Sequence, residues 1–96
     1  MSQVFEWDEE KSRENTVKHG VAFADAVAMW DGSRLDIENI AHAVGGEKRS
    51  ATVGWINGKV FIAIWTRRGR SMRLISVRRA RTYEEKIFHE KIQDRG

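Results

Sequence analysis

Apolar and polar residues alternate at the start of the sequence, and a capped helical segment follows. Residues 3–7, QVFEW, alternate as a short half-buried strand does. Asp8 then occupies the position of a helix N-cap, with acidic residues in the first turn. Lys18, His19 and Gly20 are typical of a helix end, since cations favour the last turn and glycine the residue after it. We therefore expect a strand at 3–7 and a helix from Asp8 to about Gly20.

Residues 22–31, AFADAVAMWD, change to the helical period. Four apolar residues recur at the i, i+3, i+4 and i+7 spacing of one helix face: Phe23, Ala26, Val27 and Trp30. This spacing predicts a second helix that ends near Asp31-Gly32. Residues 33–40, SRLDIENI, form a weaker strand candidate, and a polar turn follows at Gly45-Gly46.

The second half of the chain alternates again. Residues 48–56, KRSATVGWI, and 59–67, KVFIAIWTR, flank Asn57-Gly58, the preferred dipeptide of a tight type I′ hairpin. Residues 71–77, SMRLISV, predict a further strand across the turn at 68–70. Residues 80–94 predict a closing helix whose inward residues are Ala80, Tyr83, Ile87, Phe88 and Ile92. The predicted fold class is α+β: β-α-α, then an antiparallel meander and a C-terminal helix.

Length and composition set limits on the kind of protein. Ninety-six residues suit a single domain, which we place at 1–96, without repeats or low-complexity segments. The chain has no cysteine, so neither a disulfide nor a thiolate metal site can hold it together. It also lacks an apolar run long enough to cross a bilayer and an apolar signal-peptide segment. We expect a cytoplasmic protein with no membrane partner.

Charge divides unevenly along the chain. Residues 1–47 hold four Lys/Arg and ten Asp/Glu, net −6, whereas residues 48–96 hold thirteen and four, net +9. Seven arginines lie in residues 66–81, TRRGRSMRLISVRRAR, around a short apolar core. A basic surface of this kind commonly binds phosphate, although two halves of opposite charge can also neutralise each other on folding.

Arg73 and Arg78 are the least easily explained members of the arginine cluster. On an ideal strand they point to opposite faces, each beside apolar neighbours, and a guanidinium held there needs an anion to offset its desolvation. Glu84 is one candidate partner, through a pair with Arg78 or with Arg73 that ties sheet to helix. A single acid cannot serve every nearby arginine, so the remainder predict a site for a polyanion.

Two tryptophans accompany these charges on neighbouring predicted strands. Trp55 and Trp65 could stack nucleic-acid bases, as in proteins that bind single strands. Tryptophans on central strands are more often part of the core, and both interpretations stay open.

Several stretches with fixed spacings resemble one known family. Residues 5–23, FEWDEEKSRENTVKHGVAF, resemble the opening of the BrnT family of type II toxins. Residues 45–69, GGEKRSATVGWINGKVFIAIWTRRG, resemble its Gly-Glu-x-Arg strand and hairpin, and RLISVRRARTYEE, from Arg73 on, resembles its Arg-x-Ile-Ser-x-Arg-x-Ala signature. The resemblance runs from Phe5 to about His89. Two residues depart from it: Phe88 and Trp65 stand where the family usually has tyrosine.

The resemblance implies a RelE-like α+β fold and a ribonuclease that cleaves RNA without a metal or other cofactor. It also implies a partner, a BrnA-type antitoxin that blocks the toxin's site and carries a DNA-binding domain. Toxin and antitoxin of this family form a dimer of heterodimers, so a 2:2 heterotetramer is expected.

Metal-independent RNA cleavage needs cations on the phosphate oxygens and groups that move protons. The positions that match the family's motifs give the catalytic candidates: Arg49, Arg73, Arg78, His19 and Lys18. Histidine is the residue type whose unperturbed pKa lies near neutrality, which makes His19 a candidate for moving protons, although it could merely cap a helix. Further RNA-binding candidates come from the arginine cluster and its aromatic neighbour: Arg67, Arg68, Arg79 and Trp65.

Two other functions remain possible from the sequence. A metal-dependent nuclease could use Asp36 and Glu38 on one strand face, with Glu47 or Asp31 nearby, but no histidine or third acid stands at ligand spacing. We therefore predict no metal site. A non-catalytic module that binds nucleic acid or a protein partner could keep the same fold and basic face, because phosphate contacts alone give affinity without chemistry.

Overall fold

The computed structural model describes residues 3–42 and 46–94. Within them the order of elements is β1 (Val4–Glu6), α1 (Glu9–His19), α2 (Phe23–Ala26), the 3-10 helix η1 (Val27–Asp31), β2 (Arg34–His42), β3 (Lys48–Ile56), β4 (Lys59–Arg68), β5 (Ser71–Arg79) and α3 (Thr82–Asp94). This order confirms the predicted α+β class. The turn predicted at Gly45-Gly46 lies partly outside the described residues.

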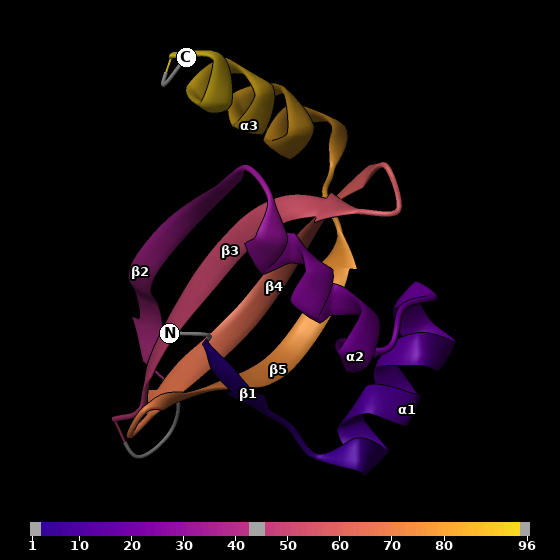
Figure 1. Ribbon diagram of the computed structural model, residues 1–96, viewed down its shortest axis with the longest axis vertical. Helices are drawn as coiled ribbons and strands as arrows, with labels where there is room; N and C mark the ends of the chain where they lie inside the picture. Colours follow the sequence, from indigo (N-terminus) through magenta and orange to yellow (C-terminus); the bar gives the residue numbers. More distant parts are fainter. Residues whose placement is uncertain (1–2, 43–45, 95–96) are drawn as a thin grey trace.

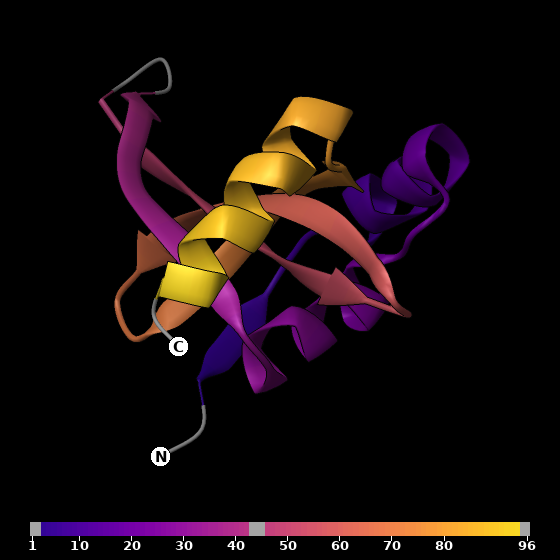
Figure 2. The ribbon, with the colours of Figure 1, turned by 90° about the horizontal axis from the view of Figure 1, so that it is seen from above.

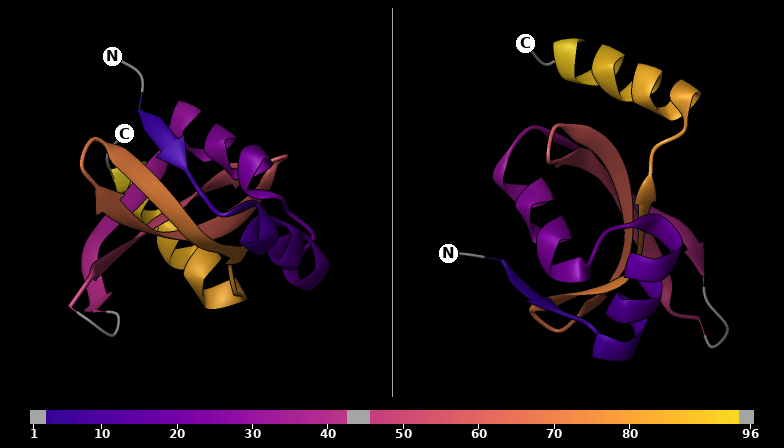
Figure 3. Two further views of the ribbon diagram at one scale, coloured as in Figure 1. Left: turned by 90° about the horizontal axis from the view of Figure 1, so that it is seen from below. Right: turned by 90° about the vertical axis from the view of Figure 1, so that its right-hand side faces the viewer.

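The five strands form one sheet in the order β1-β5-β4-β3-β2. Strands β2 to β5 are an antiparallel meander, and β1 returns to the far edge, where it pairs with β5 in parallel. Helix α3 lies across one face of the twisted sheet, while α2 and η1 lie on the other, with α1 beyond the β5 side (Figures 1 and 2). Figure 3 shows the same separation from below and from the side. We call the two faces the α3 face and the α2 face.

Alternation along each strand gives the sheet a core on each face. On the α2 face, helical residues pack against β4 and β5 through Phe23, Ala26, Met29, Ala63, Trp65, Leu74 and Val77. On the α3 face, a smaller cluster contains Ala51, Val53, Val60, Ile62, Ala80 and Phe88. The α3 cluster occupies the half of the sheet nearest the β3–β4 hairpin. The end near the β4–β5 turn is not part of it.

Helix α1 has the predicted boundaries because both ends are capped locally. The Asp8 carboxylate accepts hydrogen bonds from the backbone N–H groups of Glu10 and Lys11, and Gly20 ends the helix in the left-handed conformation. Buried Asn15 joins the helix to the sheet: its amide nitrogen donates to the Val77 carbonyl at 2.8 Å, and its amide oxygen accepts from the Val77 N–H at 3.0 Å. The orientation of α1 along β5 is thereby fixed.

The predicted type I′ hairpin is confirmed, since Asn57 and Gly58 both have positive φ, at 50° and 77°. The helix predicted over 22–31 is instead split into α2 and η1 at Val27.

Two predictions about α3 are wrong. Tyr83 and Ile87 are 60% and 47% exposed, whereas Phe88 is fully buried. The helix thus packs through Phe88, with Ile92 partly buried against the same cluster, and its Tyr83–Ile87 side faces outward.

The expectation that Arg73 and Arg78 point to opposite faces is also wrong. Arg73 pairs with Thr66 and Arg78 with Ile62, four residues apart on β4 and therefore on one face. The reason is a shift of register opposite Ile64 and Trp65, where Ile75 is one extra residue in β5. The bulge places both arginines on the α3 face.

Candidate functional site: a basic hollow on the α3 face

The end of the α3 face near the β4–β5 turn contains a hollow of about 250 Å³. Its lining consists of Lys11, Glu47, Arg49, Thr66, Arg68, Arg73, Leu74 and Ile75. We call it the basic hollow, because four of these side chains are cations and one is a carboxylate. No residue of α3 lines it, so the helix leaves this end of the sheet open.

Strand register brings the two central arginines of the basic hollow together. Thr66 on β4 pairs directly with Arg73 on β5. On the other side, Ser50 pairs with Trp65, which places Arg49 of β3 beside Thr66. Thr66 is small, buried, and donates its hydroxyl hydrogen to the Lys48 carbonyl at 2.7 Å. The short Thr66 side chain therefore leaves space between the two arginines, and their guanidinium groups can reach one ligand from both sides.

Arg49 and Arg73 have unused hydrogen-bonding capacity. The Arg49 Nε is buried and has no hydrogen-bond partner in the described part of the chain. A buried donor in this state costs about 1–3 kcal/mol. The half-buried Arg73 side chain makes no hydrogen bond or ion pair with any residue that the structure describes. Both groups are thus available to a ligand.

Arg68 has a partner, but a weak one. Its guanidinium lies 3.4 Å from the Glu47 carboxylate, and the two side chains are 55% and 33% exposed. Exposed pairs of this length contribute little free energy, so Arg68 can exchange Glu47 for a phosphate oxygen at small cost.

A second hollow, of about 210 Å³, adjoins the first. It is lined by Lys11, Glu14, Asn15, Lys18, His19, Ile75 and Ser76, and shares Lys11 and Ile75 with the basic hollow. Lys18 and His19 reach it from the last turn of α1. The structure therefore brings four of the five predicted catalytic residues, Arg49, Arg73, Lys18 and His19, to two adjoining hollows.

Arg78, the fifth, is held elsewhere on the same face. Two of its nitrogens donate to the two carboxylate oxygens of Glu84, at 2.8 and 2.9 Å, as the alternative prediction of a sheet-to-helix pair required. The Arg78 hydrogen bonds, together with the backbone N–H of Arg81, lower the pKa of Glu84 to about 2. Glu84 in turn raises the pKa of Arg78. Arg78 thus links β5 to α3 and has its anion within the chain.

The comparison with protein families gives one match. The profile described as ribonuclease toxin, BrnT, of type II toxin-antitoxin system covers residues 7–84, most of the chain. The chain belongs to the BrnT family. No curated protein matches the sequence significantly. Membership makes the protein a ribonuclease toxin by family and implies an antitoxin partner. None of the helices in the described residues is long and apolar enough to span a bilayer.

Three of the four RNA-binding candidates of this BrnT member lie on the opposite side of the sheet from the basic hollow. Arg67 stacks over the Trp65 ring, with 5.3 Å between the guanidinium carbon and the ring centre. Trp65 is only 4% exposed and donates its indole N–H to the Thr52 hydroxyl at 2.9 Å. Arg79 lies over Phe61 at 5.7 Å. Their contact with RNA stays a prediction, and Arg68 alone among these four lines the basic hollow.

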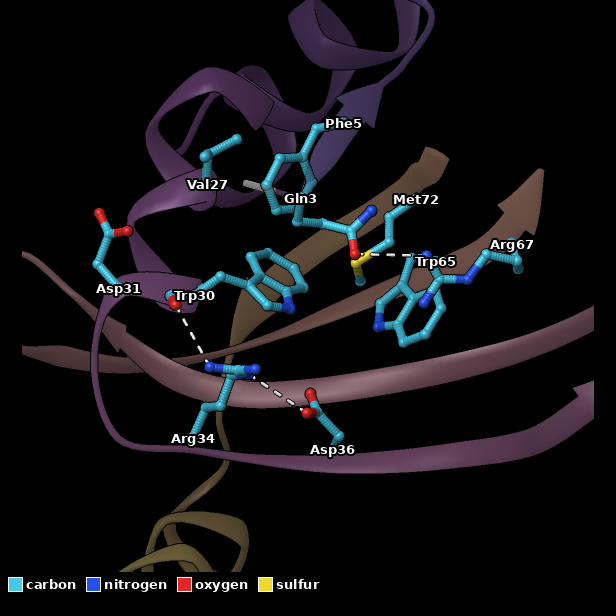
Figure 4. Close-up of a pocket in the computed structure, with 10 residues that line it drawn as sticks. All are labelled: Gln3, Phe5, Val27, Trp30, Asp31, Arg34, Asp36, Trp65, Arg67 and Met72. Atoms are coloured by element: carbon cyan, nitrogen blue, oxygen red, sulfur yellow. Dashed lines mark hydrogen bonds and ion pairs between the residues drawn. The ribbon is translucent and has the colours of Figure 1, made fainter. Parts of the chain in front are cut away.

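Sequence reasoning missed a larger hollow on the α2 face, of about 510 Å³ (Figure 4). Its lining comes from five elements and the segments around them: Gln3, Phe5, Val27, Trp30, Asp31, Arg34, Asp36, Trp65, Arg67 and Met72. We call it the aromatic hollow. The helical spacing of Trp30 indicated only a core residue, and no local signal joins residues 3–5 to residues 30–36.

Among the carboxylates considered for a metal site, Asp36 already has partners within the chain. Asp36 accepts from the Thr52 hydroxyl at 2.6 Å and pairs with Arg34 at 3.3 Å. Over residues 3–42 and 46–94 no group of three metal-ligating side chains is found. The Glu38 side chain is outside what the structure describes.

Proposed function

We propose that this BrnT-family protein is a RelE-like endoribonuclease whose basic hollow holds the phosphodiester to be cleaved, without a metal ion. The observation that carries the proposal is the arrangement of Arg49 and Arg73, two arginines with unused donors on either side of Thr66. Arginine stays charged at any working pH and can donate to two phosphate oxygens at once.

The proposed reaction uses the RNA's own 2′-hydroxyl. A bond forms between O2′ and the adjacent phosphorus, the bond from phosphorus to O5′ breaks, and the proton lost by O2′ is balanced by one gained at O5′. Arg49 and Arg73 stabilise the charge that builds on the non-bridging oxygens. In this proposal His19 and Lys18, which line the adjoining hollow, exchange these protons.

Arg78 has a different part in this proposal from the one that the family motif suggested. With both oxygens of Glu84 bound to its guanidinium, Arg78 positions β5 and α3 and does not contact the phosphate.

The proposed partner is a BrnA-type antitoxin with a DNA-binding domain, in a 2:2 assembly in the cytoplasm. The basic hollow supports this pairing, because an acidic segment of an antitoxin could occupy the same cations as RNA and so exclude the substrate.

The test is RNA cleavage by the purified chain in EDTA, with Arg73→Ala compared with Arg70→Ala. Arg70 is an exposed arginine of the β4–β5 turn that lines neither hollow on the α3 face, so it controls for the loss of one positive charge. We expect cleavage by the wild type and by Arg70→Ala, and its loss in Arg73→Ala. Cleavage that stops in EDTA and returns with Mg²⁺ contradicts the proposed mechanism. Salt-sensitive RNA binding without any product would identify the non-catalytic module instead.

A further inference from the structure

The aromatic hollow has no part in the proposed cleavage, yet it is the larger cavity and has chemistry of its own. Trp30, Phe5 and Trp65 contribute ring surface, and Val27 and Met72 add aliphatic surface. Phe5 packs against Trp30 with 4.9 Å between ring centres, which fixes the Trp30 indole at the wall (Figure 4). The hollow therefore offers flat apolar surface in a fixed orientation.

The charges of the aromatic hollow balance, in contrast to those of the basic hollow. Two carboxylates, Asp31 and Asp36, stand with two guanidinium groups, Arg34 and Arg67. A cationic or anionic guest gains little from a lining of zero net charge. A neutral planar guest with donors and acceptors on its edge can use both signs, and a nucleobase has these properties.

Two polar groups of the hollow remain available to such a guest. The Trp30 indole N–H and the exposed Asp31 carboxylate have no hydrogen bond or ion pair with any described residue. Arg67 is bound only loosely, with 3.4 Å between its terminal nitrogen and the Gln3 side-chain oxygen. Asp36 is already committed to Thr52. The available set is thus one carboxylate acceptor and donors from an indole and a guanidinium.

We propose that the aromatic hollow binds a guanine base. Guanine presents two adjacent donors, N1–H and the N2 amino group, which a carboxylate such as that of Asp31 can accept together. Its O6 and N7 are acceptors for a guanidinium such as that of Arg67. Adenine has no such donor pair, because its N1 is an acceptor. The base would lie against the ring of Trp30.

The position of the hollow makes RNA one source of that base. Arg67 and Arg68 are consecutive in β4 and point to opposite faces, so the two hollows approach each other from opposite faces beside the β4–β5 turn. From there the aromatic hollow extends across the α2 face to Arg34 and Asp36 of β2. An RNA strand that bends around the β4–β5 turn could place a guanine in one hollow and a phosphate in the other. This extension to RNA rests on the proposed function, but the base site itself does not.

The first test uses nucleosides, which lack a phosphate and so bypass the basic hollow. In two-dimensional ¹⁵N–¹H spectra the Trp30 indole signal is identified with Trp30→Phe, and that of Trp55, on the other face, is the control. We expect guanosine to shift the Trp30 signal but not the Trp55 signal, and adenosine to bind roughly tenfold more weakly. Asp31→Asn should remove most of this difference, because the amide cannot accept both donors. Equal shifts with the two nucleosides, or none with either, overturn the proposal.

The second test separates a free nucleotide from a base of the RNA substrate. Short RNAs that differ by one guanine-to-adenine change near the cleavage site are compared by their kcat/KM, in the wild type and in Asp31→Asn. A roughly tenfold preference for guanine that Asp31→Asn abolishes assigns the hollow to the substrate. No preference, together with a guanosine shift, assigns it to a free guanine ligand. If the protein cleaves no RNA, the proposed function fails and the nucleoside titration still decides the base site.

Discussion

The basic hollow and the aromatic hollow meet the sheet from opposite faces at Arg67 and Arg68 of β4, and they differ in charge. The basic hollow sets four cations against one carboxylate, and Arg49 and Arg73 in it have no partner in the described chain. The aromatic hollow balances two guanidinium groups with two carboxylates and adds three rings. Arg68 belongs to the first and Arg67 to the second, because successive residues of a strand face opposite sides.

The comparison shows that an arginine cluster in a sequence is not one site. Within residues 66–81, Arg73 lies open in a hollow, Arg78 is bound to both carboxylate oxygens of Glu84, and Arg79 lies over Phe61. Which guanidinium groups remain for a ligand depends on the face to which each side chain points, on the bulge at Ile75, and on the position of the nearest carboxylate.

The largest expected effect separates the two hollows by activity. Arg49→Ala should lower the rate of RNA cleavage by about 10²–10³-fold, since it removes a preorganised donor to the charged phosphate oxygens. Arg67→Ala, on the opposite face, should leave the rate on an RNA without guanine within a few-fold. Single-turnover cleavage measures both, with thermal unfolding as the check on folding. Equal losses in the two variants would contradict the division of roles.

The next effect concerns Arg78, whose guanidinium is paired with Glu84 within the chain. Glu84→Gln should lower the free energy of unfolding by about 1–3 kcal/mol, because Arg78 keeps its burial but loses a charged partner. Cleavage by the folded fraction should persist. Urea unfolding and cleavage assays test this together, and an inactive variant of unchanged stability would place Arg78 in the catalytic site after all.

The same pair predicts a pH dependence. The pKa of Glu84 is lowered from 4.5 to about 2 in the folded chain, chiefly by its hydrogen bonds with Arg78. A lowered pKa means that the pair stabilises the fold fully above pH 4.5 and loses this contribution as the pH falls toward 2. The stability difference between wild type and Glu84→Gln should therefore shrink over that interval. A difference that stays constant down to pH 2 would contradict the assignment.

Phe88→Tyr tests a departure from the family pattern with an effect of similar or smaller size. Phe88 is fully buried, packs edge-on against Trp55 at 5.7 Å between ring centres, and lines none of the three hollows. The added hydroxyl should cost about 1–3 kcal/mol of stability and should not raise the cleavage rate. An increase in rate would show that a phenol at this position takes part in the reaction.

The smallest predicted effect comes from a change that makes the basic hollow more positively charged and so increases its difference from the aromatic hollow. Glu47→Gln removes the one carboxylate of the basic hollow and releases Arg68. RNA should bind a few-fold more tightly, less than about fivefold, because an exposed pair contributes only about 0–1 kcal/mol. Filter binding at fixed ionic strength, with Glu85→Gln on α3 as the charge control, measures this change.

Local features of the sequence predicted most of the fold. Helix α1 is bounded by Asp8 and Gly20, and the first hairpin by Asn57-Gly58, and each of these signals acts within a few residues. The Arg78–Glu84 pair could also be predicted, because its members are six residues apart.

Features that depend on pairing between strands could not be predicted. Simple alternation along the sequence predicts that Arg73 and Arg78 point to different faces. The extra residue at Ile75 changes the face of every residue beyond it, so the two arginines share one face. The meeting of Arg49 with Arg73 depends on the register of β3 and β5 against β4. The aromatic hollow joins Phe5 to Trp30 and Asp31, which only the packing of β1 beside β5 brings together.

The most direct measurement follows the Arg49 Nε–H signal by ¹⁵N NMR while an RNA with a 2′-deoxy nucleotide at the cleavage site is added. This RNA cannot react, but its phosphate can fill the basic hollow. Because the Arg49 side chain lines the basic hollow, we predict a large shift of its Nε–H signal when the phosphate binds the guanidinium, and little change at Arg78. RNA binding that leaves the Arg49 signal in place would contradict the account.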